Sequence, residues 1–237
     1  MNSIMFFVVA EIGVNWDGDF IIAKEMMKVA KKTGCNAVKF QSFTEDMVKS
    51  HPESKRLVNS SISPKNIDEI NDLAKSIGIE WFCTPMYPDA VDFLDPYVKR
   101  FKLREFDGRN LLKNESTELF ERMKKTKKEI IVSSEESPRK CKFFGDAQIK
   151  WLYCVPKYPC ELNQLNFKNI ADFNGYSNHC TDVIAPITAA ICGAKIIEIH
   201  ITSDKSRPFV DNPVSFDYKE LELLLDDIRK IEKIRFN

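Results

Sequence analysis

The sequence has no net charge. Lys and Arg together number 35, and Asp and Glu also number 35, among 237 residues. Proteins that bind nucleic acids or membrane surfaces mainly by electrostatic attraction carry an excess of basic residues. The charge balance therefore argues against a nucleic-acid partner and against electrostatic attachment to a membrane.

Signals for secretion and membrane insertion are also missing. The longest apolar runs are far shorter than the roughly 18 residues of a membrane-spanning helix. No basic segment precedes the apolar residues 4–9, so we expect no secretory signal peptide. The seven cysteines are odd in number and form no CxxC pair, which argues against a disulfide framework or a structural zinc module. These absences predict a protein of the reducing cytoplasm.

Three common motifs of catalysis and nucleotide binding do not occur. The sequence contains no GxSxG turn of Ser-His-Asp hydrolases, no P-loop, and no GxGxxG of dinucleotide-binding domains. Their absence argues against these three classes of enzyme.

What the sequence does contain is an alternation of β-rich runs with amphipathic stretches. The predicted strands are 4–10, 37–41, 79–83, 98–103, 129–133, 149–154, 174–177 and 195–201. The predicted helices are 19–33, 65–77, 110–127, 182–193 and 217–232. Pro138 and Gly145 interrupt residues 135–147, so no full-length helix is expected there.

This order of elements predicts an α/β protein with the (β/α)8 TIM-barrel fold. Strands that alternate with helices form parallel βαβ units, and eight such strands close into a barrel. No linker or repeat divides the chain, so residues 1–237 are predicted to form a single TIM-barrel domain. The alternative is an open doubly wound sheet, which loses its main support with the missing GxGxxG.

Polar residues gather at the predicted carboxyl ends of the strands, where α/β barrels carry their active sites. Lys39 and Gln41 are two residues apart and therefore share one face of a strand. The other candidates on this rim are Glu11 and Asn15; Thr84; Lys102 and Arg104; Ser133 and Ser134; Tyr153 and Cys154; Ser177, Asn178 and His179; and Glu198, His200, Asp204 and Lys205.

Two lysines inside barrel strands point to an anionic ligand. A buried ammonium group is costly unless it meets an anion. Lys39 and Lys102, with hydroxyl-bearing residues near them, suit a phosphate and a carboxylate on one small ligand. The alternative is a structural network in which both lysines pair with Glu11 and Asp107.

The histidines leave their roles open. His179 is either a hydrogen-bonded rim residue or a metal ligand, and its spacing does not decide between them. Cys154, Cys160 and Cys180 could complete a soft metal site, but their spacing matches no known ligand pattern. His200 points either into the barrel or toward the helices.

A series of motifs in order along nearly the whole chain resembles the sialic acid synthase (N-acetylneuraminate synthase) family, with its legionaminic and pseudaminic relatives. The motifs are AEIGVNWDGD, VKFQ, CTPM, FKL, IIVSS, the YP pair at 158–159, GYSNH and IEIHIT-x-DKSRP-x-x-D. The first and last are the most specific.

The resemblance implies a (β/α)8 barrel that condenses phosphoenolpyruvate with an N-acetylated sugar aldehyde, releasing phosphate and forming a nine-carbon 2-keto acid. Glu11 would be the catalytic carboxylate near the sugar carbonyl. His179 would serve catalysis as a ligand of a divalent metal, manganese or magnesium, that polarises the aldehyde oxygen. The implied phosphoenolpyruvate contacts are Lys39, Gln41, Thr84, Lys102 and Ser133. The implied sugar contacts are Asn15, Tyr153, Asp204 and Lys205.

The sequence departs from this family in four places. The family's other metal-binding histidine falls on Tyr153, which implies a site without two histidines. Residues 103–107 (LREFD) replace a phosphate-binding loop of serine and glycine. Arg104 is the cation of this segment that would bind phosphate in place of that loop. Trp16 replaces a histidine of the opening motif. The chain ends after the barrel, so the family's C-terminal antifreeze-like cap domain is expected to come from a separate chain or to be missing.

Three functions remain open from the sequence. The leading hypothesis is a sialic acid synthase-like enzyme of surface-glycan biosynthesis, a phosphoenolpyruvate-dependent transferase that works as a homodimer or with a separate cap-domain chain. The second is a catalytically impaired barrel that acts as a binding or regulatory partner of such a synthase. The third is a lyase or aldolase that uses Lys39 or Lys102 as a Schiff-base amine.

Overall fold

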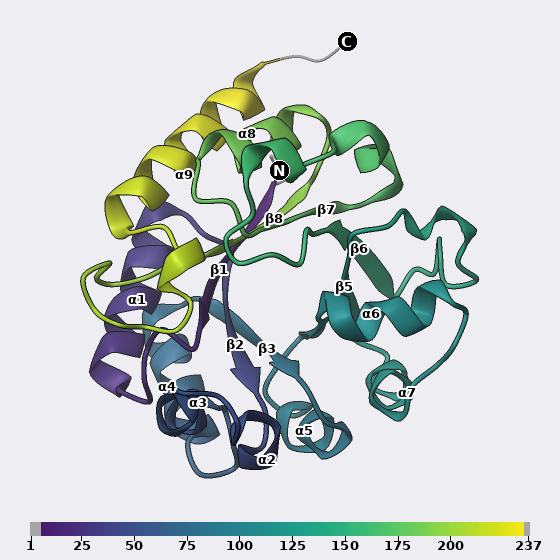
Figure 1. Ribbon diagram of the computed structural model, residues 1–237. Coiled ribbons are helices and arrows are strands. Elements are labelled where there is room, and N and C mark those ends of the chain that lie inside the picture. The colour runs from purple at the N-terminus through teal and green to yellow at the C-terminus, as the bar shows by residue number, and fades with distance from the viewer. Residues whose placement is uncertain (1–5, 235–237) are drawn as a thin grey trace.

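A computed structural model describes residues 6–234, which form a closed barrel of parallel strands surrounded by helices (Figure 1). The strands are β1 (Phe7–Gly13), β2 (Ala37–Ser42), β3 (Glu80–Pro85), β4 (Arg100–Leu103), β5 (Glu129–Ser134), β6 (Ile149–Tyr153), β7 (Gly175–Asn178) and β8 (Ile196–His200). They pair in sequence order, and β8 pairs with β1 to close the ring. The predicted TIM-barrel fold is confirmed, and the open doubly wound sheet is excluded.

The predicted strands match the observed ones with small shifts at their ends. The largest shift is in β1, which runs through Glu11 to Gly13 instead of ending at Ala10. Residues 4 and 5 of that prediction lie outside the described part of the chain. The pairing of β1 with β2 is irregular between Glu11 and Gly13, and Gly13 has a φ of +55°. Glu11 is therefore a residue within the strand and not one of the loop after it.

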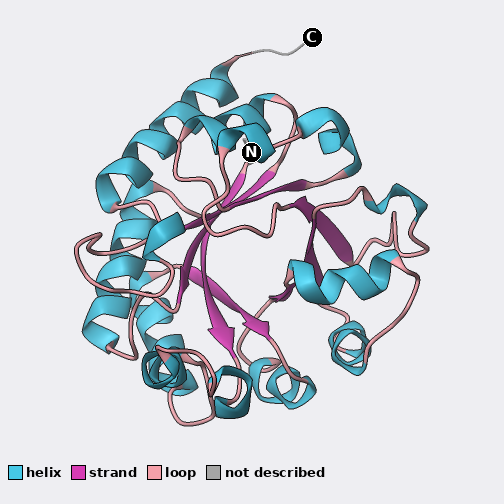
Figure 2. Cartoon of the chain, in the orientation of Figure 1, coloured by secondary structure: helices cyan, strands magenta, loops and turns pink. Residues whose placement is uncertain are grey.

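Helices form the outer ring around the strands (Figure 2). Between residues 6 and 234 the α-helices are α1 (Phe20–Thr33), α2 (Glu45–Val48), α3 (Ser54–Ser60), α4 (Ile67–Ile77), α5 (Pro88–Leu94), α6 (Glu105–Leu112), α7 (Glu118–Lys125), α8 (Ile184–Ile191) and α9 (Tyr218–Lys233). Short 3-10 helices are η1 (Pro138–Lys140), η2 (Leu162–Gln164), η3 (Phe167–Asp172) and η4 (Asn212–Val214). None of the helices in residues 6–234 is long and apolar enough to cross a membrane.

The single helix predicted at 110–127 is wrong. The chain forms α6 and α7 instead, separated by a turn in which Asn114 has a φ of +65°. Thr117 then accepts a hydrogen bond from the backbone N–H of Phe120 and so caps the start of α7. The short helices α2, α3 and α5 were not predicted either. The expected absence of a full helix at 135–147 is confirmed, since only η1 lies in that segment.

Charged and aromatic side chains gather at the amino-terminal end of the barrel. The Arg100 guanidinium lies 2.7 Å from the Glu80 carboxylate and 2.5 Å from that of Glu129. It also stacks over the ring of Phe7 at 4.4 Å. Arg100 is thus neutralised at this end of the barrel, and the polar cavity described below opens at the opposite end.

Candidate active site

A cavity of about 370 Å³ opens at the carboxyl ends of the strands. All eight strands, or the residues that directly follow them, contribute to its wall, because alternate side chains of a strand point into the barrel. The lining side chains from β1 to β8 are Glu11; Lys39 and Gln41; Thr84 and Met86; Lys102 and Arg104; Ser133; Cys154 and Pro156; Ser177 and His179; and Glu198 and His200. Known small-molecule sites span roughly 300–1,000 Å³, so a small ligand fits here.

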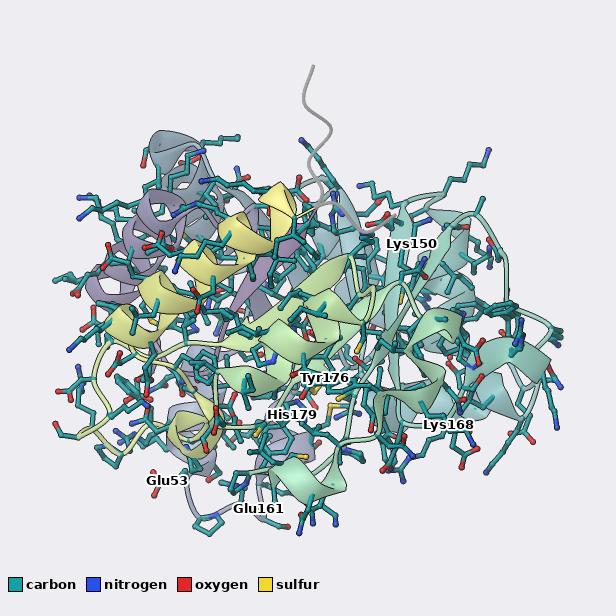
Figure 3. The ribbon with its side chains drawn as sticks, turned by 90° about the horizontal axis from the view of Figure 1, so that it is seen from above. Glu53, Lys150, Glu161, Lys168, Tyr176 and His179 are labelled. Carbon is teal, nitrogen blue, oxygen red and sulfur yellow. The ribbon has the colours of Figure 1, made fainter. Side chains whose placement is uncertain are left out.

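The side view places one residue of the cavity relative to the two ends of the barrel. His179 lies toward the same end as Glu53 and Glu161, whereas Lys150, at the start of β6, lies toward the opposite end (Figure 3). The structure brings together the seven residues implied for catalysis and phosphoenolpyruvate binding: Glu11, Lys39, Gln41, Thr84, Lys102, Ser133 and His179. Five further candidates of the rim line the same cavity: Arg104, Cys154, Ser177, Glu198 and His200.

Lys39 is held on one side of the cavity by a carboxylate and a hydroxyl. Its ammonium lies 2.9 Å from Glu11 Oε1 and donates to Thr84 Oγ1 at 3.0 Å. Glu11 Oε1 also accepts a hydrogen bond from the Gln41 amide at 3.0 Å. Burial alone would lower the pKa of Lys39, but the carboxylates of Glu11 and Glu198 outweigh burial and raise that pKa. Lys39 is therefore a fixed cation at neutral pH.

Lys102 is held on the other side by Glu198, and the two lysines share this carboxylate. Lys102 Nζ lies 3.1 Å from Glu198 Oε1, and Lys39 Nζ lies 3.8 Å from the same oxygen. Lys102 also donates to Ser133 Oγ at 2.7 Å, and Ser177 Oγ donates to Glu198 at 2.8 Å. Burial would raise the pKa of Glu198, but the two lysines hold it below its usual value.

The predicted structural network is correct for one of its two pairs. Lys39 does pair with Glu11, but Lys102 pairs with Glu198, and Asp107 pairs with Arg104 at 2.5 Å. One oxygen of each buried carboxylate, Glu11 Oε2 and Glu198 Oε2, has no hydrogen-bond partner among the described residues. A buried acceptor without a partner is costly, so these atoms are suited to a ligand that donates hydrogen bonds.

His179 is neutral, and its tautomer follows from its partner. Its Nδ1 lies 2.8 Å from the carbonyl oxygen of Val155, which can only accept, so Nδ1 carries the proton. Burial is the main cause that lowers the pKa of His179 to about 4. Nε2 therefore carries a lone pair, and the Cys154 sulfur lies 4.0 Å from it.

The structure places a second imidazole beside the first and decides the direction of His200, which the sequence left open. His200 points into the cavity, and its ring centre lies 5.4 Å from that of His179. The half-exposed ring of Tyr158 lies 4.1 Å from His179 and 5.8 Å from His200, and so covers both imidazoles. The sequence identifies Tyr158 only as part of the YP pair at 158–159 and assigns it no place in the site.

Asp211 is the acidic partner of His200. Its Oδ2 lies 3.5 Å from His200 Nδ1, and neither atom has a hydrogen-bond partner in residues 6–234. Burial would raise the pKa of Asp211, but His200 outweighs burial and lowers it. Asp211 is the last residue of the DKSRP-x-x-D motif, and membership of this motif was the sequence feature that could have pointed to Asp211 as a site residue.

Asn15 lies outside the cavity and holds the segment that carries Asp211. Its amide nitrogen donates to the carbonyl of Ile201 and to Ser215 Oγ, both at 2.9 Å. Its amide oxygen accepts from the backbone N–H of Asp211 at 3.1 Å. Asn15 is fully buried and does not line the cavity, so it is placed to position Asp211.

Three other residues selected from the sequence also lie away from the cavity. Tyr153 points out of the barrel, where its hydroxyl accepts from the Asn166 N–H at 3.0 Å and its ring stacks on Tyr176. Asp204 bonds to Ser206 in the loop after β8, and Lys205 pairs with Glu220 of α9. The prediction that Tyr153 lies at the sugar or metal site is therefore corrected: alternation along β6 turns Cys154 inward and Tyr153 outward.

The substituted segment 103–107 forms the rim of the cavity next to Lys102. Arg104 precedes α6, and no side chain caps this helix. The Arg104 guanidinium bonds to Asp107, contacts the Met86 sulfur at 3.3 Å and lies 5.3 Å from the ring centre of Phe106. Trp16, in contrast, is fully buried and donates to the Ser60 carbonyl at 3.0 Å, outside the cavity.

No thiol cluster accompanies the histidines. Cys154 Sγ lies 3.7 Å from His179 Nδ1, and burial raises its pKa to about 12, so it is a neutral thiol. Between residues 6 and 234, no three His, Cys, Asp or Glu side chains are grouped to hold a metal ion by themselves.

Comparison with known proteins assigns the barrel to a family. The sequence pattern of the NeuB family matches residues 26–236. The chain belongs to the NeuB family. An uncharacterized protein of Methanocaldococcus jannaschii is 33% identical over 246 residues, covering 96% of this chain and 71% of that protein. The N,N'-diacetyllegionaminic acid synthase of Legionella pneumophila is 29% identical, covering 98% of this chain and 74% of the enzyme.

A solved structure agrees with this assignment. The N-acetylneuraminic acid (sialic acid) synthetase from Leptospira borgpetersenii superposes with a TM-score of 0.84 at 26% identity. The match covers 96% of this chain and 84% of that structure. The resemblance read from the sequence motifs is therefore confirmed at the level of the NeuB family.

Proposed function

We propose that this chain condenses phosphoenolpyruvate with an aldose or an N-acetylated sugar, giving a 2-keto-3-deoxy (nonulosonic) acid for surface-glycan biosynthesis. The observation that carries the proposal is the pair of buried lysines, each bonded to a hydroxyl, on the wall of a cavity in a NeuB-family barrel. Relatives named as legionaminic and pseudaminic acid synthases support a condensation of this kind.

In this proposal the lysines bind the two anionic groups of phosphoenolpyruvate. Lys39 with Thr84 and Lys102 with Ser133 form two donor pairs on consecutive strands of the barrel, β2–β3 and β4–β5. A phosphate on one pair and a carboxylate on the other would receive charge-assisted hydrogen bonds. Gln41 would orient the substrate from its place beside Glu11.

The reaction forms one C–C bond and breaks one bond to phosphate. C3 of phosphoenolpyruvate attacks the aldehyde carbon, whose oxygen takes up a proton and becomes a hydroxyl. Water adds at C2 and loses a proton, and the bond from C2 to the phosphate oxygen then breaks while the C2 hydroxyl gives up its proton, which leaves the ketone and releases phosphate. Glu11 is the group placed to move these protons, because its Oε2 is buried and has no hydrogen-bond partner among residues 6–234.

The two imidazoles suit a divalent metal when the substrate supplies further ligands. His179 Nε2 carries a lone pair, and His200 Nδ1 and Asp211 Oδ2 are buried without a hydrogen-bond partner in the described part of the chain, residues 6–234. Imidazole nitrogen and carboxylate oxygen are donors for manganese, and the substrate oxygens would complete the shell. A bound metal would polarise the aldehyde oxygen.

The Schiff-base alternative is weaker for Lys39. An imine-forming lysine must lose its proton, which requires a lowered pKa. The neighbouring carboxylates raise the pKa of Lys39 instead. Its role as a fixed cation is the one that the surroundings favour.

The direct test is phosphate release from phosphoenolpyruvate in the presence of aldoses and N-acetylated sugars. We expect release with at least one sugar, and a thermal shift by phosphoenolpyruvate alone. Manganese and a chelator, added in parallel, measure the metal dependence. Absence of both release and shift contradicts the proposal, and a shift without release supports the binding-partner hypothesis instead.

Gly13 offers a second test, because it lies where three functional side chains converge. A Cβ there would lie 3.0 Å from Asp211 Oδ2, 3.1 Å from Gln41 Nε2 and 3.2 Å from Glu11 Oε1. Alanine also strains the positive φ at a cost of about 1 kcal/mol. We expect Gly13→Ala to lower phosphate release at least about tenfold, since a misplacement of about 1 Å can cost more.

Gly78 supplies the matched control for this variant. It also has a positive φ, of +73°, but a Cβ there would meet nothing within 4 Å. Gly78→Ala should therefore lose stability but keep its activity. Equal activity losses in the two variants would show that backbone strain, and not crowding of the site, causes the effect.

A further inference from the structure

A small apolar cluster joins three segments at the carboxyl-terminal end of the barrel. It lies apart from the main core, and its buried members are Val14, Phe43 and Leu57. Val14 follows β1, Phe43 follows β2, and Leu57 belongs to α3. Val210, from the loop after β8, packs against this cluster. The cluster therefore connects the loop that carries Asp211 to segments near the start of the chain.

Arg56 on α3 is a polar link between the same segments. One nitrogen of its guanidinium lies 2.9 Å from Asp17 Oδ2, in the turn between β1 and α1. Another nitrogen donates to the Pro208 carbonyl at 2.5 Å, in the loop after β8. Arginine can hold two acceptors at a fixed angle because its N–H donors lie in one plane. Arg56 thus fixes the turn after β1 and the loop after β8 relative to each other.

The ion pair of Arg56 with Asp17 is shielded more than a typical surface pair. The two side chains are 27% and 16% exposed. Fully exposed pairs contribute little, because water and salt screen them. Glu53 lies 3.5 Å from the nitrogen that bonds to Pro208, but it belongs to the same turn as Arg56 and ties it to no other segment. The contacts to Asp17 and Pro208 are therefore the ones that hold the two loops.

Asp211 depends on the loop after β8 for its place beside His200. Pro208 lies three residues before Asp211, and Asn15 accepts from the Asp211 backbone N–H at 3.1 Å. The carboxylate of Asp211 then lies 3.5 Å from His200 Nδ1, and neither atom has a hydrogen-bond partner within the described range 6–234. An ionised carboxylate only accepts hydrogen bonds, so Asp211 favours the tautomer of His200 that has its proton on Nδ1.

We propose that Arg56 is a positioning residue, which holds Asp211 against His200 through the loop after β8. This contact keeps the imidazole proton of His200 on Nδ1 and leaves the lone pair on Nε2, as in His179. Arg56 does not line the cavity, so it acts through the loop and not on a ligand. Its effect on catalysis rests on the proposed function, whereas its effect on His200 does not.

The imidazole nitrogens of His200 test this proposal without any substrate. The chain has three histidines, few enough to assign their nitrogen NMR resonances by substitution. Arg56→Met should bring the Nδ1 and Nε2 resonances of His200 closer together, because the two tautomers then exchange. Asp211→Ala removes the carboxylate and should shift them in the same direction. The resonances of His179 should keep their pattern in both variants, since its Nδ1 donates to the Val155 carbonyl.

Two further variants separate this link from a general loss of structure. Lys55→Met is the matched control, because Lys55 is the exposed neighbour of Arg56 on α3; it should leave His200 unchanged. Asp17→Asn removes one charge that holds Arg56, and asparagine tolerates the φ of +51° at this position. It should shift the His200 resonances in the same direction as Arg56→Met, but less. Unshifted His200 resonances in a folded Arg56→Met protein overturn the proposal; if that variant does not fold, unshifted resonances in Asp17→Asn overturn it.

A double-mutant cycle on activity measures whether the link serves catalysis. Arg56→Met should lower kcat for phosphate release at least about tenfold, since a misplacement of about 1 Å can cost more. The KM for phosphoenolpyruvate should change little, because the lysines that bind it lie on β2 and β4. In the Asp211→Ala background, Arg56→Met should cause no further loss. An equal further loss there overturns action through Asp211. A wild type that releases no phosphate contradicts the proposed function instead, and the His200 resonances then decide the role of Arg56.

Discussion

Replacing Lys102 by methionine is expected to lower phosphate release by about 10²–10³, the typical cost of removing one charge-stabilising donor from an active site. Lys102 is 3% exposed and donates to Ser133 at 2.7 Å on the cavity wall. Methionine keeps the length and apolar character of the side chain but supplies no cation for the substrate. The measurement is the steady-state rate of phosphate release, with circular dichroism to verify folding.

Two further variants show whether the lower rate of phosphate release comes from the missing cation at position 102. Lys99→Met is the matched control, because Lys99 lies three residues earlier and its side chain is 79% exposed; it should keep full activity. Lys102→Arg keeps the charge and should recover part of the affinity for phosphoenolpyruvate. If Lys102→Met retains the wild-type rate, Lys102 has only a structural role and the proposed substrate site is wrong.

Replacing Glu198 by glutamine is expected to destabilise the barrel by about 3 kcal/mol, the lower end of the cost of breaking a buried ion pair. Glu198 is 3% exposed and lies between two ammonium groups, so its loss leaves Lys102 without a carboxylate. Urea unfolding of the wild type and the variant measures the difference. Glu232→Gln, on the exposed side of α9, is the control and should change the free energy of unfolding by less than about 0.5 kcal/mol.

A double-mutant cycle separates the pair from its surroundings. In the Glu198→Gln background, Lys102→Met should cost about 1–3 kcal/mol less than in the wild type, because the lysine has already lost its partner. Additive costs would mean that the two residues do not interact, contrary to the 3.1 Å distance between them.

The sequence predicts the fold well where local patterns and topology agree. Gly34 and Gly78, both with positive φ, end α1 and α4 where they were expected to end. The break between α6 and α7 was missed because Asn114 and Lys113 continue an acceptable helical pattern, and only the left-handed conformation of Asn114 interrupts it. Such a turn depends on packing against the barrel, which a single sequence does not reveal.

The candidate site is predictable where polar and apolar residues alternate along a strand, and not where a loop supplies the residue. Lys39 and Gln41 stand out because their neighbours on β2 are apolar. Strand β8 alternates in the same way, with Ile199 between Glu198 and His200, and both polar side chains line the cavity as Lys39 and Gln41 do. Asp211 enters the site from a loop held by Asn15, and that contact joins residues 196 positions apart.

The shared carboxylate of Glu198 has a consequence for the order in which the protein assembles. The two lysines belong to β2 and β4, but the carboxylate between them belongs to the last strand, 96 residues after Lys102. During synthesis the lysines leave the ribosome long before this counter-ion, and contacts so distant in sequence form slowly. Docking of β8 against β1 closes the ring and brings Lys102 its counter-ion, so the complete binding wall exists only once the last strand is in place.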